Sequence, residues 1–239
     1  MVSVLRTLRI AGLALAGVGL LGGGVWLFGW SDLVRYRQLR VVGATHVTEA
    51  QARHLADIPT DTPLLAVDLD RVVAGVERHP WVASAEARRV FPDTVVVVVH
   101  ERVPRAVLSL DQLYLVDEAG VPFRKADAGD LDRVLLTGLD PVLAEREPEL
   151  ARRILHDGLG ILDAAIATGE LRENEISEVR FGALSGYTLA LRNGGEILLG
   201  FRGSDALARL SRLVAAGVDL RQPHRIDLGM DRHAVVTPS

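Results

Sequence analysis

The hydrophobic pattern separates the chain into one long apolar run and a remainder in which apolar and polar residues alternate. Residues 10–30 are 21 consecutive uncharged residues, rich in Leu, Val, Ala and Gly. Because an α-helix rises about 1.5 Å per residue, this run can cross the ~30 Å hydrocarbon core of a bilayer. The pattern therefore predicts a tail over residues 1–9 and a single N-terminal transmembrane helix over residues 10–30.

A cleaved signal peptide is the alternative interpretation of this run. Residues 14–16 mimic a cleavage site, but only about four apolar residues precede them, whereas a secretory signal needs about 7–15. Cleavage near residues 22–24 stays open. Arginines flank the run almost equally, so charge counting leaves the orientation open. Gly19 and Gly23 have the spacing at which a second transmembrane helix can approach closely.

After a polar linker over residues 31–37, residues 38–106 predict a first domain. Residues 39–42 favour a strand. Thr48 and Gln51 have the spacing of a capping box, which predicts a short helix ending before Pro59. Apolar residues recur with a helical period over 69–76, where Asp68 can cap the start. Alternation over 82–90, a turn at 91–94 and a valine run at 95–99 predict two further strands.

Residues 107–239 predict a mixed, β-rich second domain with two amphipathic helices, which makes the fold class α+β. A hairpin is expected over 113–123, and 125–149 is expected to be irregular. One helix carries apolar residues from 150 to 166 and ends at Gly169, and the other runs from Ser204 to Gly217. Strands are expected over 176–181, 187–191, 196–199, 225–228 and 234–236.

Composition excludes several classes of function. The formal net charge is −4 and the pI is about 6.0, so no basic field favours nucleic-acid binding. The chain has no cysteine, which excludes disulfides, thiolate metal sites and a cysteine nucleophile, and suits an oxidising compartment. Aromatic residues make up only 5%, so the cores are expected to consist of Val, Leu, Ile and Ala.

No pattern of residues indicates catalysis. The chain lacks the phosphate-binding, dinucleotide-binding, zinc-protease and nucleophile-elbow motifs. Its seven histidines are scattered without the spacing of metal ligands. Asp68 and Asp70 suit a helix start, and Asp227 and Asp231 suit a turn. We therefore expect no catalytic residue, cofactor or metal site. The charged residues at 88–89 and 101–102 are expected on the solvent face of a sheet.

An ordered set of short motifs resembles the FtsQ/DivIB family of bacterial cell-division proteins. The first three segments, 79–82, 89–94 and 101–106, resemble the family's POTRA domain, of strand-helix-helix-strand-strand order. Residues 116–123 resemble the opening hairpin of the family's β domain, and residues 226–236 resemble its last hairpin. The residues that carry the POTRA resemblance are Pro80, Trp81, Arg89, Pro92, Glu101, Arg102 and Pro104.

The resemblance implies a non-enzymatic, single-pass type II protein of the cytoplasmic (inner) membrane, with its bulk outside the cytoplasm at the division septum. It implies FtsB- and FtsL-like partners and proximity to the septal wall synthase, with lipid contact through one helix and no nucleic acid. The family contact is strand addition to the edge of the terminal hairpin. The corresponding residues are Arg225, Ile226, Asp227, Leu228, His233, Ala234, Val235 and Val236. Gly229 occupies the position where the family commonly has Arg, so we do not expect this chain to make a contact through an Arg side chain there.

Two alternatives stay open at this stage. A POTRA-bearing component of a secretion or envelope-assembly complex would be favoured by a co-encoded barrel partner or by localisation away from the septum. A membrane-anchored hydrolase with a dispersed site would be favoured by a deep pocket that holds strongly perturbed carboxylates or histidines.

Overall fold

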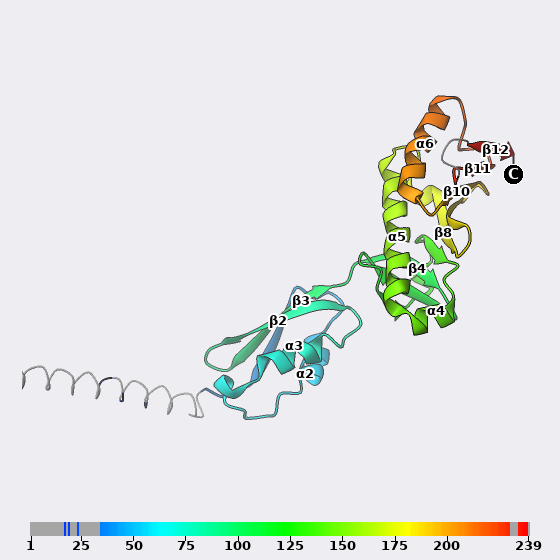
Figure 1. The fold of residues 1–239 in the computed structure, drawn as a ribbon. Helices are drawn as coiled ribbons and strands as arrows, with labels where there is room; N and C mark the ends of the chain where they lie inside the picture. Colours follow the sequence, from blue (N-terminus) through cyan, green and yellow to red (C-terminus); the bar gives the residue numbers. More distant parts are fainter. Residues whose placement is uncertain (1–16, 18, 20–22, 24–33, 230–233, 239) are drawn as a thin grey trace, which may run out of the picture. The chain divides into compact units, whose positions relative to one another are not determined.

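The computed structural model describes residues 17, 19, 23, 34–229 and 234–238. The chain divides into two compact units, Met1–Glu101 and Arg102–Ser239, coloured from blue to red in Figure 1. Most of the predicted transmembrane run lies outside the described residues, and within the described part of the chain no helix has the length and apolarity to cross a membrane. Residues 34–37 were predicted as linker, but Val34 and Tyr36 are buried in the first unit.

The first unit is a three-stranded sheet with two helices on one side (Figure 1). Its elements are β1 (Gln38–Val42), α2 (Glu49–Ala56), the 3-10 turn η2 (Leu64–Ala66), α3 (Leu69–Val76), β2 (Val82–Val90) and β3 (Thr94–Glu101). β3 lies in the centre, parallel to β1 and antiparallel to β2. The order of strands and helices is the predicted one.

The two helices begin at the predicted caps and touch through a glycine. Thr48 Oγ1 accepts a hydrogen bond from the Gln51 amide at 3.2 Å, and Gln51 Oε1 accepts one from the Thr48 amide at 2.9 Å. Asp68 caps α3 by accepting from a backbone N–H. A Cβ added at Gly75 would lie 2.3 Å from the carbonyl oxygen of Leu55. The backbones of α2 and α3 therefore meet where only glycine fits.

The carboxylate of Glu101, at the end of β3, binds the loop between β1 and α2. Glu101 Oε1 accepts from the amides of Thr45, His46 and Val47 at 2.8, 2.6 and 3.1 Å, and Oε2 lies 2.8 Å from His46 Nδ1. Burial raises the pKa of Glu101, but these hydrogen bonds outweigh burial and hold that pKa below its ordinary value. The expectation that Glu101 faces solvent is wrong, because its side chain is only 13% exposed. It ties the β1–α2 loop to β3.

Arg102, the next residue, makes an equivalent contact inside the second unit. Its guanidinium donates to Oδ2 of Asp117, whose side chain is 9% exposed. Oδ1 of Asp117 accepts from the amides of Ala119 and Val121 at 3.0 and 2.9 Å. Glu101 is thus held in the first unit and Arg102 in the second, and a single peptide bond joins the two residues. The division falls after Glu101 instead of after residue 106 because β4 (Pro104–Ser109) belongs to the second sheet.

The second unit is one mixed nine-stranded sheet with helices packed against it (Figure 1). The strand order is β12-β11-β10-β9-β8-β7-β4-β5-β6. The remaining bounds are β5 (Leu113–Asp117), β6 (Pro122–Lys125), β7 (Leu135–Thr137), α4 (Pro141–Arg146), α5 (Pro148–Ala167), β8 (Ile176–Gly182), β9 (Gly186–Leu191), β10 (Glu196–Gly200), α6 (Gly203–Ala215), β11 (His224–Asp227) and β12 (Val235–Pro238), with 3-10 turns η3 (Ala128–Asp130) and η4 (Glu173–Glu175).

The core of the second unit lies between this sheet and the apolar faces of α5 and α6. Leu159 and Leu162 from α5 and Leu207 from α6 are buried in it, as the helical period predicted. The Tyr187 hydroxyl on β9 donates to the carbonyl oxygen of Ile154 on α5 at 3.0 Å. Burial raises the pKa of Tyr187, so the phenol stays a protonated donor that fastens helix to sheet.

Three elements of the second unit escaped the sequence prediction. β4 precedes the predicted hairpin, and β7 and α4 lie in the stretch that was expected to be irregular. β7 has only three residues and pairs in parallel with β4 and β8, so its partners are distant in the sequence. Ser204 is not the cap of α6, since the N-cap position is Arg202 and no side chain caps that helix.

Replacing Glu101 by Gln should lower the unfolding free energy of the first unit by about 1–3 kcal/mol, because bonds to a charged acceptor become bonds to a neutral one. A carboxylate with a lowered pKa stabilises above its ordinary pKa of 4.5, and this contribution is lost as the pH falls through the folded-state value. Urea unfolding followed by circular dichroism at several pH values measures both effects. The exposed Glu86→Gln is the control, and equal behaviour of the two variants would contradict the assignment.

Gly75→Ala should destabilise the first unit by about 1–3 kcal/mol, because the added methyl group meets a backbone carbonyl that cannot move independently. Gly160 on α5 is the matched control, since no atom lies within 4 Å of an added Cβ there. Gly160→Ala should stabilise the second unit by about 0.5–1 kcal/mol through helix propensity. Thermal unfolding by circular dichroism measures both, and a stabilising Gly75→Ala would refute the close helix contact.

Candidate functional site

The terminal hairpin forms one edge of the nine-stranded sheet. β11 pairs in parallel with β10 and antiparallel with β12, with Asp227 opposite Val235 and Arg225 opposite Thr237. β12 has no second neighbour among the described strands and lies at the outer end of the sheet (Figure 1). Val235 and Val236 on β12 are 50% and 37% exposed. The hairpin therefore presents a short, apolar strand edge to solvent.

The structure divides the eight hairpin residues predicted to bind a partner. Ile226 and Leu228 are buried in the core, so their side chains support the sheet and do not form a surface. Arg225 is exposed and its guanidinium lies 3.3 Å from Glu196 on β10. The carboxylate of Asp227 accepts from the Gly229 amide at 2.8 Å and begins the turn after β11. Ala234, Val235 and Val236 are exposed, and His233 lies outside the described residues.

The opposite edge of the sheet has a different character. β6 begins with Pro122, which has no backbone N–H, and continues through Arg124 to Lys125. Arg124 forms ion pairs with Asp127 and Asp130 at 3.2 and 2.6 Å. Proline and charged residues are the features that protect a sheet edge from further pairing. The edge at β12 has two exposed valines before its own terminal proline, Pro238.

A hollow beside the hairpin was missed by the sequence analysis. It measures about 620 Å³ and lies between the end of β10, one side of α6 and the turn after β11. Its lining residues are Leu199, Phe201, Arg202, Asp205, Arg209, Arg212 and Gly229. Phe201 is 63% exposed, and Arg209 donates to the carbonyl oxygen of Leu228. An aromatic residue just after a strand and arginines on one helix are the signals that could have indicated it.

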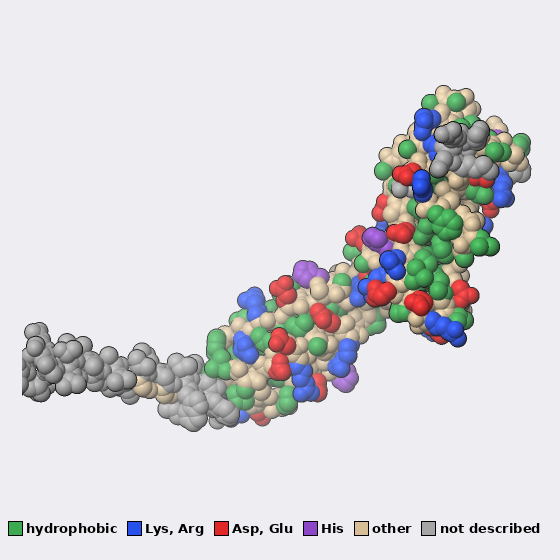
Figure 2. All heavy atoms as spheres, in the orientation of Figure 1, with side chains coloured by type: hydrophobic (Ala, Val, Ile, Leu, Met, Phe, Trp, Pro, Cys, Tyr) green, Lys and Arg blue, Asp and Glu red, His purple; other side chains and the backbone are tan. Residues whose placement is uncertain are grey.

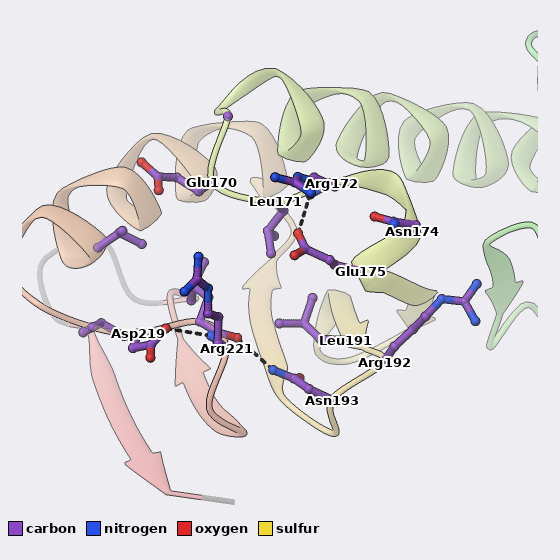
Figure 3. A pocket seen from close by; sticks show the side chains of 14 residues that line it. Glu170, Leu171, Arg172, Asn174, Glu175, Leu191, Arg192, Asn193, Asp219 and Arg221 are labelled. Carbon is purple, nitrogen blue, oxygen red and sulfur yellow. Dashed lines mark hydrogen bonds between the residues drawn. The ribbon is translucent and has the colours of Figure 1, made fainter.

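A second pocket of about 600 Å³ lies where the end of α5, the β9–β10 turn and the α6–β11 connection meet (Figure 3). Several of its charged and amide side chains form hydrogen bonds with nearby backbone groups. Glu175 accepts from the Arg172 amide at 2.8 Å, and Asn193 donates to the carbonyl oxygen of Leu220 at 2.8 Å. No histidine, serine or threonine lines it, so the described lining contains no nucleophile paired with a base.

The motif residues Trp81 and Arg89 contact other parts of the first unit and stabilise its fold. Trp81 stacks on the ring of His46, with the centroids 3.7 Å apart, and follows Pro80 in the turn between α3 and β2. Arg89 was expected to face solvent, but its guanidinium donates to the carbonyl oxygens of Leu64 and Val67 at 2.9 and 2.6 Å. It thereby fastens η2 to the sheet.

The remaining motif residues mark turns and the boundary between the units. Pro92 follows a cis peptide bond in the β2–β3 turn, and Pro104 begins β4. Among the described residues, no group of three or more His, Asp or Glu side chains is arranged to hold a metal ion. Gly19 and Gly23 are helical, with open space where a Cβ would stand, and the rest of the predicted span around them lies outside the described residues.

Comparison with known proteins matches both units. Residues 34–102 match the family model described as POTRA domain, FtsQ-type, and residues 106–229 match the one described as Cell division protein FtsQ/DivIB, C-terminal. Together the two matches cover the described part of the chain almost from end to end.

Curated relatives named Cell division protein FtsQ align over most of the chain. The one from Anaeromyxobacter sp. (strain K) is 38% identical over 208 residues, which are 85% of this chain and 69% of that protein. The one from Myxococcus fulvus is 34% identical over 87% of this chain and 75% of its own length. The one from Streptomyces bingchenggensis is 32% identical over 98% of this chain and 87% of its own length. With these matches, the chain belongs to the FtsQ/DivIB family of bacterial cell-division proteins.

Proposed function

We propose that this protein is a non-enzymatic scaffold of the division machinery, which recruits and connects septal proteins at the cytoplasmic membrane. Residues 10–30 anchor it as a single-pass protein, and both folded units lie outside the cytoplasm at the septum. Membership of the FtsQ/DivIB family supports the role in division, and the apolar run supports the anchor. The family resemblance supports this orientation, which the nearly balanced flanking charges leave open.

Strand addition at β12 is the proposed mode of partner binding. The observation that carries it is the difference between the two sheet edges, since β6 carries the charged residues Arg124 and Lys125 while β12 exposes Val235 and Val236. An incoming strand would pair with the free backbone groups of β12, and the valines would contact its alternate side chains. The proposed partners are FtsB- and FtsL-like proteins, which connect this chain to the septal wall synthase.

The hollow beside the hairpin supports a second point of contact for the same partner. Phe201 offers an exposed aromatic face, and among the described lining residues Arg202, Arg209 and Arg212 outnumber the acidic Asp205. Such a surface suits a partner segment that carries acidic and apolar side chains next to its pairing strand. The lining of the hollow includes Gly229, two residues after the end of β11, and β11 is the strand that pairs with β12.

Neither alternative from the sequence is supported by a specific feature. The secretion alternative rested on the POTRA fold alone. The family model that matches the first unit is the FtsQ-type POTRA domain, and the second unit matches the FtsQ/DivIB C-terminal model. The hydrolase reading required a pocket with strongly perturbed acid–base groups. Among the described residues, the two pockets of about 600 Å³ are lined mainly by arginines, a few acidic residues and aliphatic side chains.

Val235→Pro should abolish co-purification of the FtsB-like partner, because proline removes a backbone donor from the edge strand and distorts its pairing. Val235→Thr keeps the branched shape and the N–H and should retain binding within about threefold, as a substitution of well under 1 kcal/mol. Urea unfolding monitored at Trp81 should be unchanged in both variants. Wild-type binding by the proline variant would refute strand addition at β12.

A fluorescent fusion to the cytoplasmic tail should gather at midcell during constriction, and depletion of the protein should give filamentous cells. Both results follow if the chain is a required septal scaffold. Fluorescence microscopy with simultaneous membrane staining measures the enrichment relative to the lateral membrane. A uniform membrane signal together with normal cell length after depletion would argue for a role elsewhere in the envelope.

A further inference from the structure

One end of the first unit exposes large apolar side chains that no element of that unit covers. Phe91, in the β2–β3 turn, is 56% exposed, and Leu65, in η2, is 47% exposed. Hydrophobic side chains are visible at this end of the unit in Figure 2, over the tip of the hairpin that Figure 1 draws between β2 and β3. Both residues lie outside the buried core.

Both apolar segments are held beside the point at which the chain enters the unit. The amides of Arg37 and Gln38 donate to the carbonyl oxygen of Asp93 at 2.8 and 3.2 Å, which places the β2–β3 turn next to the start of β1. Arg35 forms a β-bridge with Pro63, just before η2. The turn that carries Phe91 and the turn that carries Leu65 therefore flank the same entering segment.

The length of the entering segment brings this end of the unit close to the membrane. The predicted span ends at Trp30, and Val34 is already fully buried in the core of the first unit. Four residue steps reach at most about 14 Å, even when they are fully extended. An amphipathic element at a bilayer surface buries its apolar side chains about 5–10 Å into the interface. The tether thus leaves little room between the unit and the lipid.

Charge at this end is compatible with an anionic bilayer surface. Arg37 is exposed beside the β2–β3 turn, and the guanidinium of Arg35 donates to the carbonyl oxygen of Asp61 at 2.6 Å. Basic residues next to a membrane are attracted to anionic headgroups, while aromatic and aliphatic side chains enter the boundary below them. Val42, at the opposite end of β1, is 52% exposed as well, but lies a whole strand away from the entry point.

We propose that Phe91 and Leu65 form a membrane-contact patch that docks the first unit onto the lipid surface next to its own anchor. The patch rests on the proposed membrane anchor at residues 10–30. The occupant is the bilayer interface, because the short tether presents that surface to this end of the unit before any other. Docking would restrict the tilt of the first unit and so set the direction in which the chain leaves the membrane.

Site-directed spin labelling of the full chain tests the patch directly, since the protein has no cysteine that would compete for the label. Single variants Phe91→Cys and Leu65→Cys probe the patch. Val42→Cys is the matched exposed position in the same unit, and Leu20→Cys probes the anchor. Each labelled protein is reconstituted in vesicles of phosphatidylethanolamine with a minority of phosphatidylglycerol. Power-saturation measurements then give the accessibility of each label to oxygen and to a water-soluble nickel complex.

The patch predicts an oxygen-to-nickel accessibility ratio several-fold higher at positions 91 and 65 than at 42, with the highest ratio at 20. A high ratio at 20 with positions 91 and 65 equal to 42 would overturn the patch and leave the anchor standing. An aqueous label at 20 would overturn the anchor and the patch together. Labels at 91 and 65 that are shielded from both reagents would indicate a protein occupant, and would also overturn the proposal.

Discussion

An open β-sheet has two edges, and the organisation of the second unit depends on how each edge is treated. The nine strands form a single layer that does not close on itself, so a row of backbone donors and acceptors faces outward at β6 and at β12. The chain protects the first edge with Pro122, Lys125 and the ion pairs of Arg124. At the second edge it exposes valines. The unpaired backbone groups at β12 therefore lack the protection that β6 has, and they form a surface suited to pairing with another strand.

The inner strand of the hairpin at that edge, β11, packs against the core of the second unit. Ile226 and Leu228 are buried among the side chains of the strands and helices, and Arg209 on α6 donates to the carbonyl oxygen of Leu228. An incoming strand would therefore meet an edge whose inner side is already fixed, which lowers the ordering cost of binding. The exposed valines stand on β12, which pairs with β11, and the Arg-lined hollow includes Gly229, two residues after the end of β11.

Two carboxylates, partly buried Glu101 and buried Asp117, have a comparable organising role at the boundary between the units. Glu101 collects three backbone amides of the first unit, and Asp117 collects the guanidinium of Arg102 and two amides of the second. A carboxylate that is shielded from water is costly unless it is hydrogen-bonded, so each of these groups holds its neighbours in one arrangement. The sequence pattern predicted a solvent face for residues 101–102, because charge alone does not reveal such partners.

Local patterns were sufficient to predict most of the first unit and the long elements of the second. The caps at Thr48 and Asp68, the valine run of β3 and the apolar face of α5 act over a few residues, so they can be recognised without the fold. β7 could not be found in this way, since its three residues owe their conformation to parallel partners on β4 and β8. Likewise, the exposed pair of Val235 and Val236 and the buried pair of Ile226 and Leu228 are equally apolar in the sequence.

The sequence by itself determined the apolar run at 10–30, the order of elements in the first unit, the absence of cysteine chemistry and the resemblance that the comparisons bore out. Only the tertiary structure decided which strand forms the open edge, which residues of the hairpin are buried, and where the chain passes from one unit to the other. The reason is physical. Caps and periodicity are local properties, whereas exposure and edge position depend on strand pairs brought together from distant parts of the chain.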